Sequence, residues 1–398
     1  MSIVAERLNS VKVSPSMAAK ARVDALRAEG RDIVDFTIGE PDFPTPDHIV
    51  AAGVDALQGG HTRYTSAAGT PALRNAIASK LARENQLQFS PEQVVVACGA
   101  KQIIFEALSA SLNAGDEVIV PAPYWVSYPD MVAIHGGVPV IVPSGPATGF
   151  KLTPEMLEAA ITPRTRWLIL NSPNNPTGAV YSAQELRGLA DVLERHPRVW
   201  LLTDEIYEHY VYGGASHVSV LVVAPELAPR TLIVNGMSKS YAMTGWRLGY
   251  GAGPLPLMKA ITLLLSQNTS CAASMSQYAA AAALEGPQDC VRSAVALFSQ
   301  RRDRMVELLG QIPGIACSTP DGAFYVFPSV QGLLGKSAGR TLATDADVMM
   351  YLLEAAGVAT IDGTSYGMPG FLRLSFATSM DRIEIGCEKI RAACADLR

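Results

Sequence analysis

The stretch TLIVNGMSKSYAMTGWRLGYGAG, residues 231–253, is decisive for the fold because two apolar runs flank a polar turn. The runs, 231–236 and 247–253, are short and largely apolar, as in strands that are buried on both faces of a sheet. The turn carries Lys239 and Arg247 among residues that are otherwise apolar, small or hydroxylic. Because a cation that loses its hydration must find a partner, this turn raises the question of what the two cations bind.

Similar apolar runs recur through the middle of the chain, mostly separated by segments that are long enough for a helix. This alternation is typical of a largely parallel sheet with helices on its faces. It predicts an α/β fold with a mostly parallel seven-stranded sheet between helices in a large domain over residues 46–290. We expect a smaller α+β domain over residues 291–398, and an N-terminal arm with part of the small domain over residues 1–45. The further strands are expected at 93–100, 116–121, 138–144, 166–173 and 199–205.

Composition limits the classes of function. The chain has 398 residues, 48% hydrophobic and 17% charged, with a formal net charge of −5, so no basic footprint for nucleic acid is present. We expect neither a signal peptide nor a membrane span, because no apolar run is long enough. Six scattered cysteines without a CxxC pattern indicate reduced thiols and therefore the cytoplasm. The histidines show no metal-binding spacing, so no metal site is predicted.

Polar or glycine-containing turns follow four of the expected strands, at 98–101, 171–178, 204–207 and 235–239. In open α/β sheets, ligands bind beyond the carboxyl ends of the strands. These turns therefore predict a ligand site at one edge of the sheet.

Three side chains in or near these turns have definite chemical uses. A lysine such as Lys239 is usually solvated, but a desolvated lysine becomes a nucleophile or a Schiff-base former. The planar fork of Arg247 suits a phosphate, although a structural ion pair would also satisfy it. Asp204 ends a buried run and must be paired, either with a cationic ring nitrogen or with an arginine.

Other signals are weak when each is taken alone. Gly99 begins a helix whose N–H groups could face a phosphate. Trp125 could stack on a planar cofactor, or belong to the core. Arg373 lies in an alternating strand and needs a carboxylate partner, from the protein or from a substrate. The glycines of 249–253 are rejected as a dinucleotide fingerprint because no clear helix follows Pro254.

Together, these segments closely resemble the class I, fold-type I pyridoxal-phosphate aminotransferases, in particular their bacterial aspartate aminotransferase branch. The resemblance extends essentially over the whole chain. It implies an amino transfer between an L-amino acid and a 2-oxo acid by a ping-pong mechanism. The matching segments are GEPDF (39–43), TRYTSAAGTPALR (62–74), PYWVSYPDM (123–131), NSPNNPTG (171–178), DEIYEH (204–209), SKSYAMTGWRLGY (238–250) and RLSFATS (373–379).

The resemblance implies that three residues are catalytic. Lys239 matches the lysine that holds pyridoxal 5′-phosphate as an internal aldimine and then moves the substrate proton. Asp204 matches the carboxylate beside the pyridine nitrogen, and Tyr207 a partner of the phenolic oxygen. Tyr64 matches a tyrosine that reaches the cofactor of the other subunit, so a homodimer with shared active sites is implied. The remaining cofactor-binding residues are Gly99, Ala100, Lys101, Trp125, Asn175, Ser238 and Arg247.

The same resemblance implies a substrate site. Arg373 matches the clamp on the α-carboxylate, and Lys101 matches a lysine associated with the side-chain carboxylate of aspartate and glutamate. A hydroxyl at Ser16 stands where relatives that transaminate prephenate carry threonine. Prephenate, aromatic or neutral donors, a β-lyase, and a regulator of the same fold therefore remain alternatives. The other substrate-binding residues are Gly39, Trp125 and Asn175.

Overall fold

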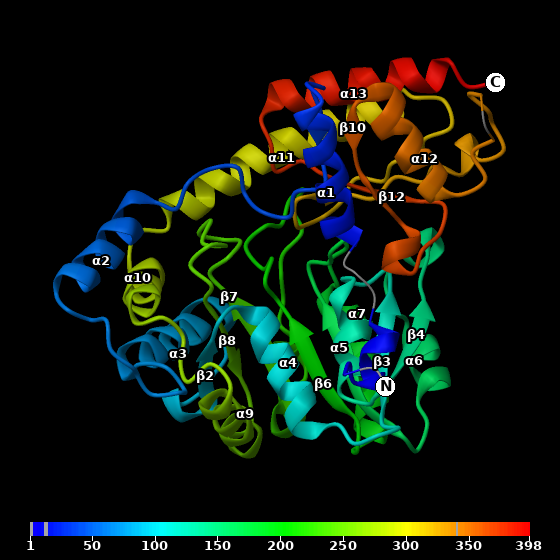
Figure 1. The fold of residues 1–398 in the computed structure, drawn as a ribbon. Helices are drawn as coiled ribbons and strands as arrows, with labels where there is room; N and C mark the ends of the chain where they lie inside the picture. Colours follow the sequence, from blue (N-terminus) through cyan, green and yellow to red (C-terminus); the bar gives the residue numbers. More distant parts are fainter. Residues whose placement is uncertain (1–2, 12–14, 340) are drawn as a thin grey trace.

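The computed structural model describes residues 3–11, 15–339 and 341–398. Figure 1 shows a large lower body built on a sheet, and a smaller upper part that carries the C-terminal helix. None of the helices in the described ranges has the length and hydropathy that a membrane crossing requires.

A seven-stranded sheet among the described residues has the order β2–β8–β7–β6–β5–β3–β4. The paired neighbours are parallel except where β8 meets β7 and β2. The predicted mostly parallel sheet is therefore confirmed. The strands are β2 Val94–Ala97, β3 Glu117–Ala122, β4 Val138–Pro143, β5 Thr165–Asn171, β6 Trp200–Asp204, β7 Thr231–Gly236 and β8 Gly249–Ala252.

Both faces of this sheet are buried. Val94 and Val96 belong to one apolar core, whereas Val95 and Ala97 of the same strand belong to another. Because successive side chains of a strand point to opposite faces, a strand buried on both sides must be apolar throughout.

Helices form the two covering layers. One core includes side chains of α2 Asp47–Gln58, α3 Pro71–Asn85, α6 Pro154–Ala160, α7 Ala183–Arg195, α8 Val220–Val223 and α10 Ser274–Glu285. The other includes side chains of α4 Ala100–Ser111, α5 Ser127–Ile134 and α9 Leu255–Gln267.

The upper part joins a segment after α1 (Pro15–Ala28) to segments of the C-terminal region. Val34 pairs with Val358, and the amide of Ser375 donates to the Phe36 carbonyl at 2.8 Å. The domain boundaries given above stay predictions. The elements are β1 Val34–Asp35, β9 Tyr325–Val326, β10 Val358–Ala359, β11 Ile361–Asp362, β12 Leu372–Ser375, α1 Pro15–Ala28, α11 Asp289–Gly310, α12 Asp345–Tyr351 and α13 Met380–Ala395.

One expectation was wrong: α9 begins directly after Pro254, where no clear helix was predicted. Pro254 is the N-cap and another proline lies in the first turn. Proline is tolerated there because the first N–H groups of a helix have no intrahelical partner.

The crossing of β8 and α4 fixes the edge of the sheet where the ligand site is expected. A Cβ atom on Gly249 would lie 2.2 Å from the Ala100 nitrogen and 2.5 Å from the Gly99 carbonyl carbon. Only a residue without a side chain allows the strand to pass this close to the helix start.

Replacing Gly249 by alanine should therefore force the main chain of β8 away from the main chain at the start of α4. We expect Gly249→Ala to lower the free energy of unfolding by about 1–3 kcal/mol or more, measured by urea denaturation. Gly310→Ala is the control, because a Cβ at that helical position meets nothing within 4 Å. It should leave stability unchanged or raise it by up to about 1 kcal/mol. Equal stability of the two variants would contradict the close crossing.

Candidate active site

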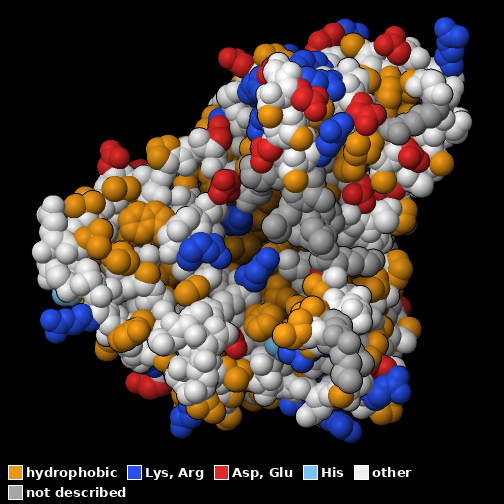
Figure 2. All heavy atoms as spheres, viewed as in Figure 1, with side chains coloured by type: hydrophobic (Ala, Val, Ile, Leu, Met, Phe, Trp, Pro, Cys, Tyr) orange, Lys and Arg blue, Asp and Glu red, His pale blue; other side chains and the backbone are white. Residues whose placement is uncertain are grey.

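A cavity of about 610 Å³ lies at the carboxyl edge of the sheet, beneath the upper part of the molecule. Figure 2 shows the hollow, with lysine and arginine side chains gathered around it. Of the residues predicted for the site, its walls include Gly39, Gly99, Ala100, Lys101, Trp125, Asn175, Asp204, Tyr207, Ser238, Lys239, Arg247 and Arg373.

Two predicted site residues are not in these walls. Tyr64 is 88% exposed in the single chain, away from the cavity, and its predicted place in a second subunit stays a prediction. Ser16 falls in α1 where the side chains lie outside the described part of the structure, so its predicted role is not tested.

The amine of Lys239 is held by a main-chain carbonyl. Its Nζ atom donates to the Gly39 oxygen at 2.5 Å. Burial lowers the pKa of Lys239 to about 8, and the charge of Glu40 opposes that shift. At neutral pH the protonated form still predominates, but the neutral amine, which is the form that attacks a carbonyl carbon, is far more populated than in an exposed lysine.

Asp204 is 4% exposed and has no cationic partner of its own among the described hydrogen bonds and ion pairs. Its carboxylate accepts from the Tyr128 hydroxyl at 2.7 Å and from the Ile206 amide at 3.2 Å. Burial raises the pKa of Asp204 to about 6, and these two donors oppose the rise. A cation brought into the cavity would stabilise the ionised form.

Arg373 is buried without the carboxylate partner that the sequence suggested, among the described residues. Its guanidinium donates to the Thr37 carbonyl at 2.6 Å and to Asn175 Oδ1 at 3.3 Å, and its Nε atom has no partner. The charge lies 4.5 Å from the centre of the Tyr325 ring. A buried fork that lacks an acidic partner is suited to an incoming carboxylate.

The helix start that follows β2 faces the same cavity. Gly99 caps α4 with φ 93°, and a Cβ there would meet Arg247 Nη2 at 2.7 Å. Arg247 donates to the carbonyls of Thr244 and Cys98, at 2.8 and 3.3 Å, so it is not in a structural ion pair in the described structure. N–H groups at a helix start beside an arginine form an anion site.

Lys101 projects from the first turn of α4. Its amine lies 4.7 Å from the centre of the Trp125 ring. Although the residue as a whole is exposed, partial burial of its amine and then the charge of Arg247 lower the pKa of Lys101.

The chain matches the family described as aminotransferase class I and II over residues 31–390. The chain belongs to this family. It is therefore an enzyme that transfers amino groups.

Relatives match along the whole length. A probable aspartate/prephenate aminotransferase from Rhizobium leguminosarum is 49% identical, and the match covers 99% of each chain. An aspartate aminotransferase from Rhizobium meliloti is 50% identical, over 98% of this chain and 96% of that protein. A crystal structure of the aspartate aminotransferase from Rhizobium meliloti superimposes with a TM-score of 0.98 at 48% identity, over 100% of each chain. That of Thermus thermophilus with maleate gives 0.92 at 41%, over 99% of this chain and 100% of the other.

The cavity of this class I and II aminotransferase is also lined by residues that the sequence did not single out, among them Tyr128, Asn171 and Tyr325. Asn171 joins two predicted residues, since its Nδ2 donates to the Asp204 carbonyl and its Oδ1 accepts from the Asn175 amide. The hydroxyl of Tyr325 lies 2.9 Å from that of Tyr207. Tyr128 and Asn171 lie within the segments 123–131 and 171–178 quoted above, whereas Tyr325 lies in none of the quoted segments. A buried tyrosine is usually core, so nothing in the sequence marked Tyr325.

Replacing Tyr128 by phenylalanine should remove a donor that favours the ionised form of Asp204. The pKa of Asp204 should then rise above about 6, measured by carbon-13 NMR titration of aspartate-labelled protein. Tyr181→Phe is the control, because its hydroxyl bonds the Leu152 amide instead. An unchanged pKa in Tyr128→Phe would show that this hydrogen bond does not govern the carboxylate.

Proposed function

We propose that this chain is a pyridoxal-phosphate-dependent aminotransferase that moves the amino group of an acidic L-amino acid, aspartate or glutamate, to a 2-oxo acid. The observation that carries the proposal is the joint presence of Lys239 and Asp204 in one cavity. One offers an amine with a lowered pKa, and the other a buried carboxylate without a cationic partner in the described structure.

The donor groups fit this cofactor. The start of α4, with Gly99 and Arg247, would hold the phosphate. Asp204 would pair with the protonated ring nitrogen, which compensates the charge that burial makes costly. Tyr207 and Asn175 would reach the phenolic oxygen, and the face of the ring would lie against the Trp125 side chain.

When bound, pyridoxal phosphate supplies an electron sink that stabilises negative charge at the substrate Cα atom. Lys239 would hold the cofactor covalently, and the incoming amino group would free the lysine. Its amine would then take the proton from the substrate Cα as a base and deliver it, as an acid, to a different carbon atom, the C4′ of the cofactor. A lysine with a pKa near 8 can do both, because both of its protonation states are populated around that pH.

The polar ends of the cavity favour an acidic substrate. Arg373 would bind the α-carboxylate, which is then held over Gly39, and Lys101 would meet the carboxylate of the side chain. The relatives named above include aspartate aminotransferases, and the Thermus structure contains maleate, itself a dicarboxylate.

Prephenate, a 2-oxo acid, is a second candidate amino acceptor, because full-length relatives carry the name aspartate/prephenate aminotransferase. Prephenate also bears carboxylate groups, so Lys101 and Arg373 would serve both substrates. The alternatives of a β-lyase and of neutral or aromatic donors gain no support from these relatives, nor does a regulator.

We also propose a homodimer in which Tyr64 reaches the partner's cofactor phosphate. Its 88% exposure in the single chain supports this, since a second chain would cover it. Apolar side chains are exposed nearby on α2 and α10, at Val50, Val54, Leu57 and Tyr278.

The cysteines are free thiols throughout the described residues, which supports the cytoplasm as location.

The covalent role of Lys239 can be tested by trapping. After incubation with pyridoxal phosphate and borohydride, mass spectrometry should find a pyridoxyl adduct at residue 239. Lys239→Ala should lack that adduct and lose transamination by at least about 1,000-fold. Lys259→Ala removes an exposed amine of α9 and should keep both the adduct at residue 239 and the transamination activity. An active, cofactor-bound Lys239→Ala protein would refute the assignment.

The substrate class can be tested through Lys101. Lys101→Gln keeps a polar side chain but removes the charge, so kcat/KM for aspartate should fall about 10- to 100-fold. The value for alanine, which has no second carboxylate, should stay within about twofold, and this also controls for indirect effects on the cofactor. Equal losses for the two amino acids would count against an acidic substrate.

A further inference from the structure

The segment that ends β6 continues past the cavity and contacts the turn that carries Lys239. Asp204 and Tyr207 line the cavity. The next three residues, Glu208, His209 and Tyr210, each bond a different part of residues 235–240. We call these three residues the 208–210 clamp.

Glu208 holds the residue at which β7 leads into the turn. Its Oε1 atom accepts from Asn235 Nδ2 at 2.7 Å, and Asn235 Oδ1 accepts from the Gly236 amide at 2.7 Å. All three residues are buried. The position of Asn235, four residues before Lys239, is therefore fixed by a carboxylate from the neighbouring strand end.

Tyr210 bonds the reactive lysine itself, through its main chain. Its hydroxyl donates to the Lys239 carbonyl at 2.9 Å. The Tyr210 ring is fully buried and packs edge-on against Phe298 and Phe324. Because the ring is packed against both phenylalanines, its hydroxyl has little freedom to move. The hydrogen bond therefore holds the main chain of residue 239 in place.

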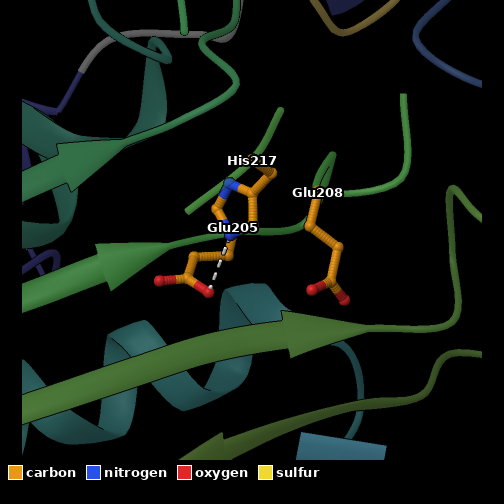
Figure 3. A group of neighbouring side chains, drawn as sticks. All are labelled: Glu205, Glu208 and His217. Atoms are coloured by element: carbon orange, nitrogen blue, oxygen red, sulfur yellow. Dashed lines mark hydrogen bonds and ion pairs between the residues drawn. The ribbon is translucent and has the colours of Figure 1, made fainter. Parts of the chain in front are cut away.

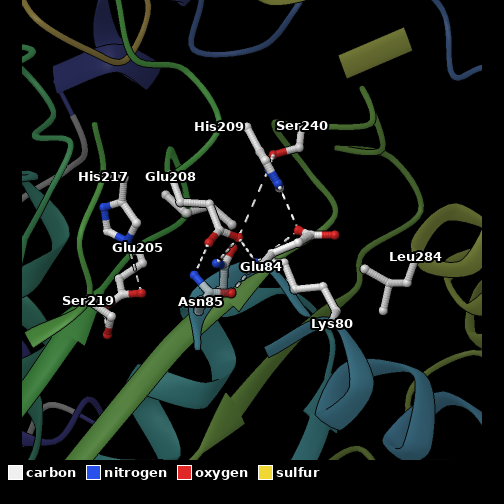
Figure 4. A network of polar contacts seen from close by, with 12 residues as sticks. Lys80, Glu84, Asn85, Glu205, Glu208, His209, His217, Ser219, Ser240 and Leu284 are labelled. Atoms are coloured by element: carbon white, nitrogen blue, oxygen red, sulfur yellow. Dashed lines mark hydrogen bonds and ion pairs between the residues drawn. The ribbon is translucent and has the colours of Figure 1, made fainter. Parts of the chain in front are cut away.

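His209 holds the other side of the turn. Its Nδ1 atom lies 2.7 Å from Ser240 Oγ, and its Nε2 atom lies 3.2 Å from Glu84 on α3. Figure 4 shows the imidazole between the serine and the glutamate. The clamp thus bonds the turn before, at and after Lys239.

A buried counter-charge keeps the clamp in place. Lys80 of α3 is 1% exposed and pairs with Glu208, while Asn85 Nδ2 donates to the second oxygen of Glu208 at 2.6 Å. Burial raises the pKa of Glu208, but the neighbouring charges, that of Lys80 first, together with the Asn85 hydrogen bond more than offset this and hold that pKa well below its usual value. Glu208 is therefore ionised and tied to α3.

Glu205, Glu208 and His217 lie together and have the donor types of a metal site. Donor groups of the protein itself, however, bond the carboxylate oxygens of the two glutamates. Figure 3 shows His217 directed at Glu205, at 3.1 Å, and not at Glu208. Thr203 and Ser219 donate to the other oxygen of Glu205. The carboxylate oxygens of this group are therefore occupied by protein donors, whereas His217 Nδ1 is buried without a hydrogen-bond partner in the described structure.

We propose that Glu208, His209 and Tyr210 are positioning residues that hold the backbone on both sides of Lys239, so that its amine meets the cofactor and the substrate Cα in one orientation. This inference rests on the proposed function, in which Lys239 is the reactive amine. It assigns the clamp to the geometry of proton transfer and not to the binding of substrate.

Tyr210→Phe tests this directly, because it removes the hydroxyl and keeps the packed ring. In the holoenzyme, kcat for aspartate should fall about 10- to 100-fold, since a small displacement of a reacting group is costly. KM should stay within about twofold. Hydrogen exchange followed by mass spectrometry should be at least about fivefold faster at the amides of Tyr241 and Ala242, which bond the carbonyls of Met237 and Lys239.

Tyr212→Phe is the matched control. Tyr212 is also buried, and its hydroxyl also donates to a main-chain carbonyl, that of Ala323 at 2.6 Å, but not to the lysine turn. It should keep kcat within about twofold and leave exchange at residues 241 and 242 unchanged, since its hydrogen bond lies outside the turn.

A second pair of variants tests His209. His209→Ala should lower kcat, and His209→Asn should restore part of it, because asparagine can still bond Ser240.

The outcomes separate this inference from the proposed function. A pyridoxyl adduct at Lys239 in wild type and Tyr210→Phe, with slower turnover and faster local exchange only in Tyr210→Phe, supports the clamp. Adducts in both proteins with equal kcat, or with a fall in kcat but unchanged exchange, overturn the clamp and leave the proposed function intact. Absence of the adduct from fully loaded wild type overturns both.

Discussion

The cost of burying charge is the constraint on which the active site depends. Asp204 and Arg373 are buried and Lys239 is partly buried, yet each is bonded only to neutral groups in the described structure: a tyrosine hydroxyl, a main-chain amide, main-chain carbonyls and an asparagine. Such partners offset part of the lost hydration and leave the charge itself uncompensated. The protein thus keeps unpaired charges of both signs around one cavity, where a ligand of complementary charge completes them.

A second set of buried charges, on the far side of the same strand ends, is fully compensated. Lys80 and Glu208 pair directly, and amides satisfy the remaining acceptor positions. Breaking a buried pair of this kind leaves an isolated charge, which is strongly destabilising. Residues 204–210 connect the two sets of charges. The paired Lys80 and Glu208 therefore support the same segment that carries Asp204 and Tyr207 to the cavity.

The sheet was predictable because strands buried on both faces must be apolar throughout, and the turns at their carboxyl ends are polar. The positions of Lys239, Asp204 and Gly99 follow from that topology. Tyr128 and Tyr210 could not be assigned roles in advance, since a tyrosine hydroxyl finds its partner only through tertiary packing. The start of α9 was missed because prolines, which usually end helices, occupy its first turn. Tyr64 has no hydrogen-bond partner among the described residues, so its predicted contact with a second chain stays a prediction.

The extended segment Thr37–Gly39 offers one carbonyl to Arg373 and another, two residues on, to Lys239. In the proposed function, a substrate carboxylate bound by Arg373 would take the place of the Thr37 oxygen, so binding would exchange one acceptor for another, with a small net gain per contact. An anion that fits poorly would gain too little to displace this main-chain oxygen. The backbone of the protein would then compete with such anions for Arg373.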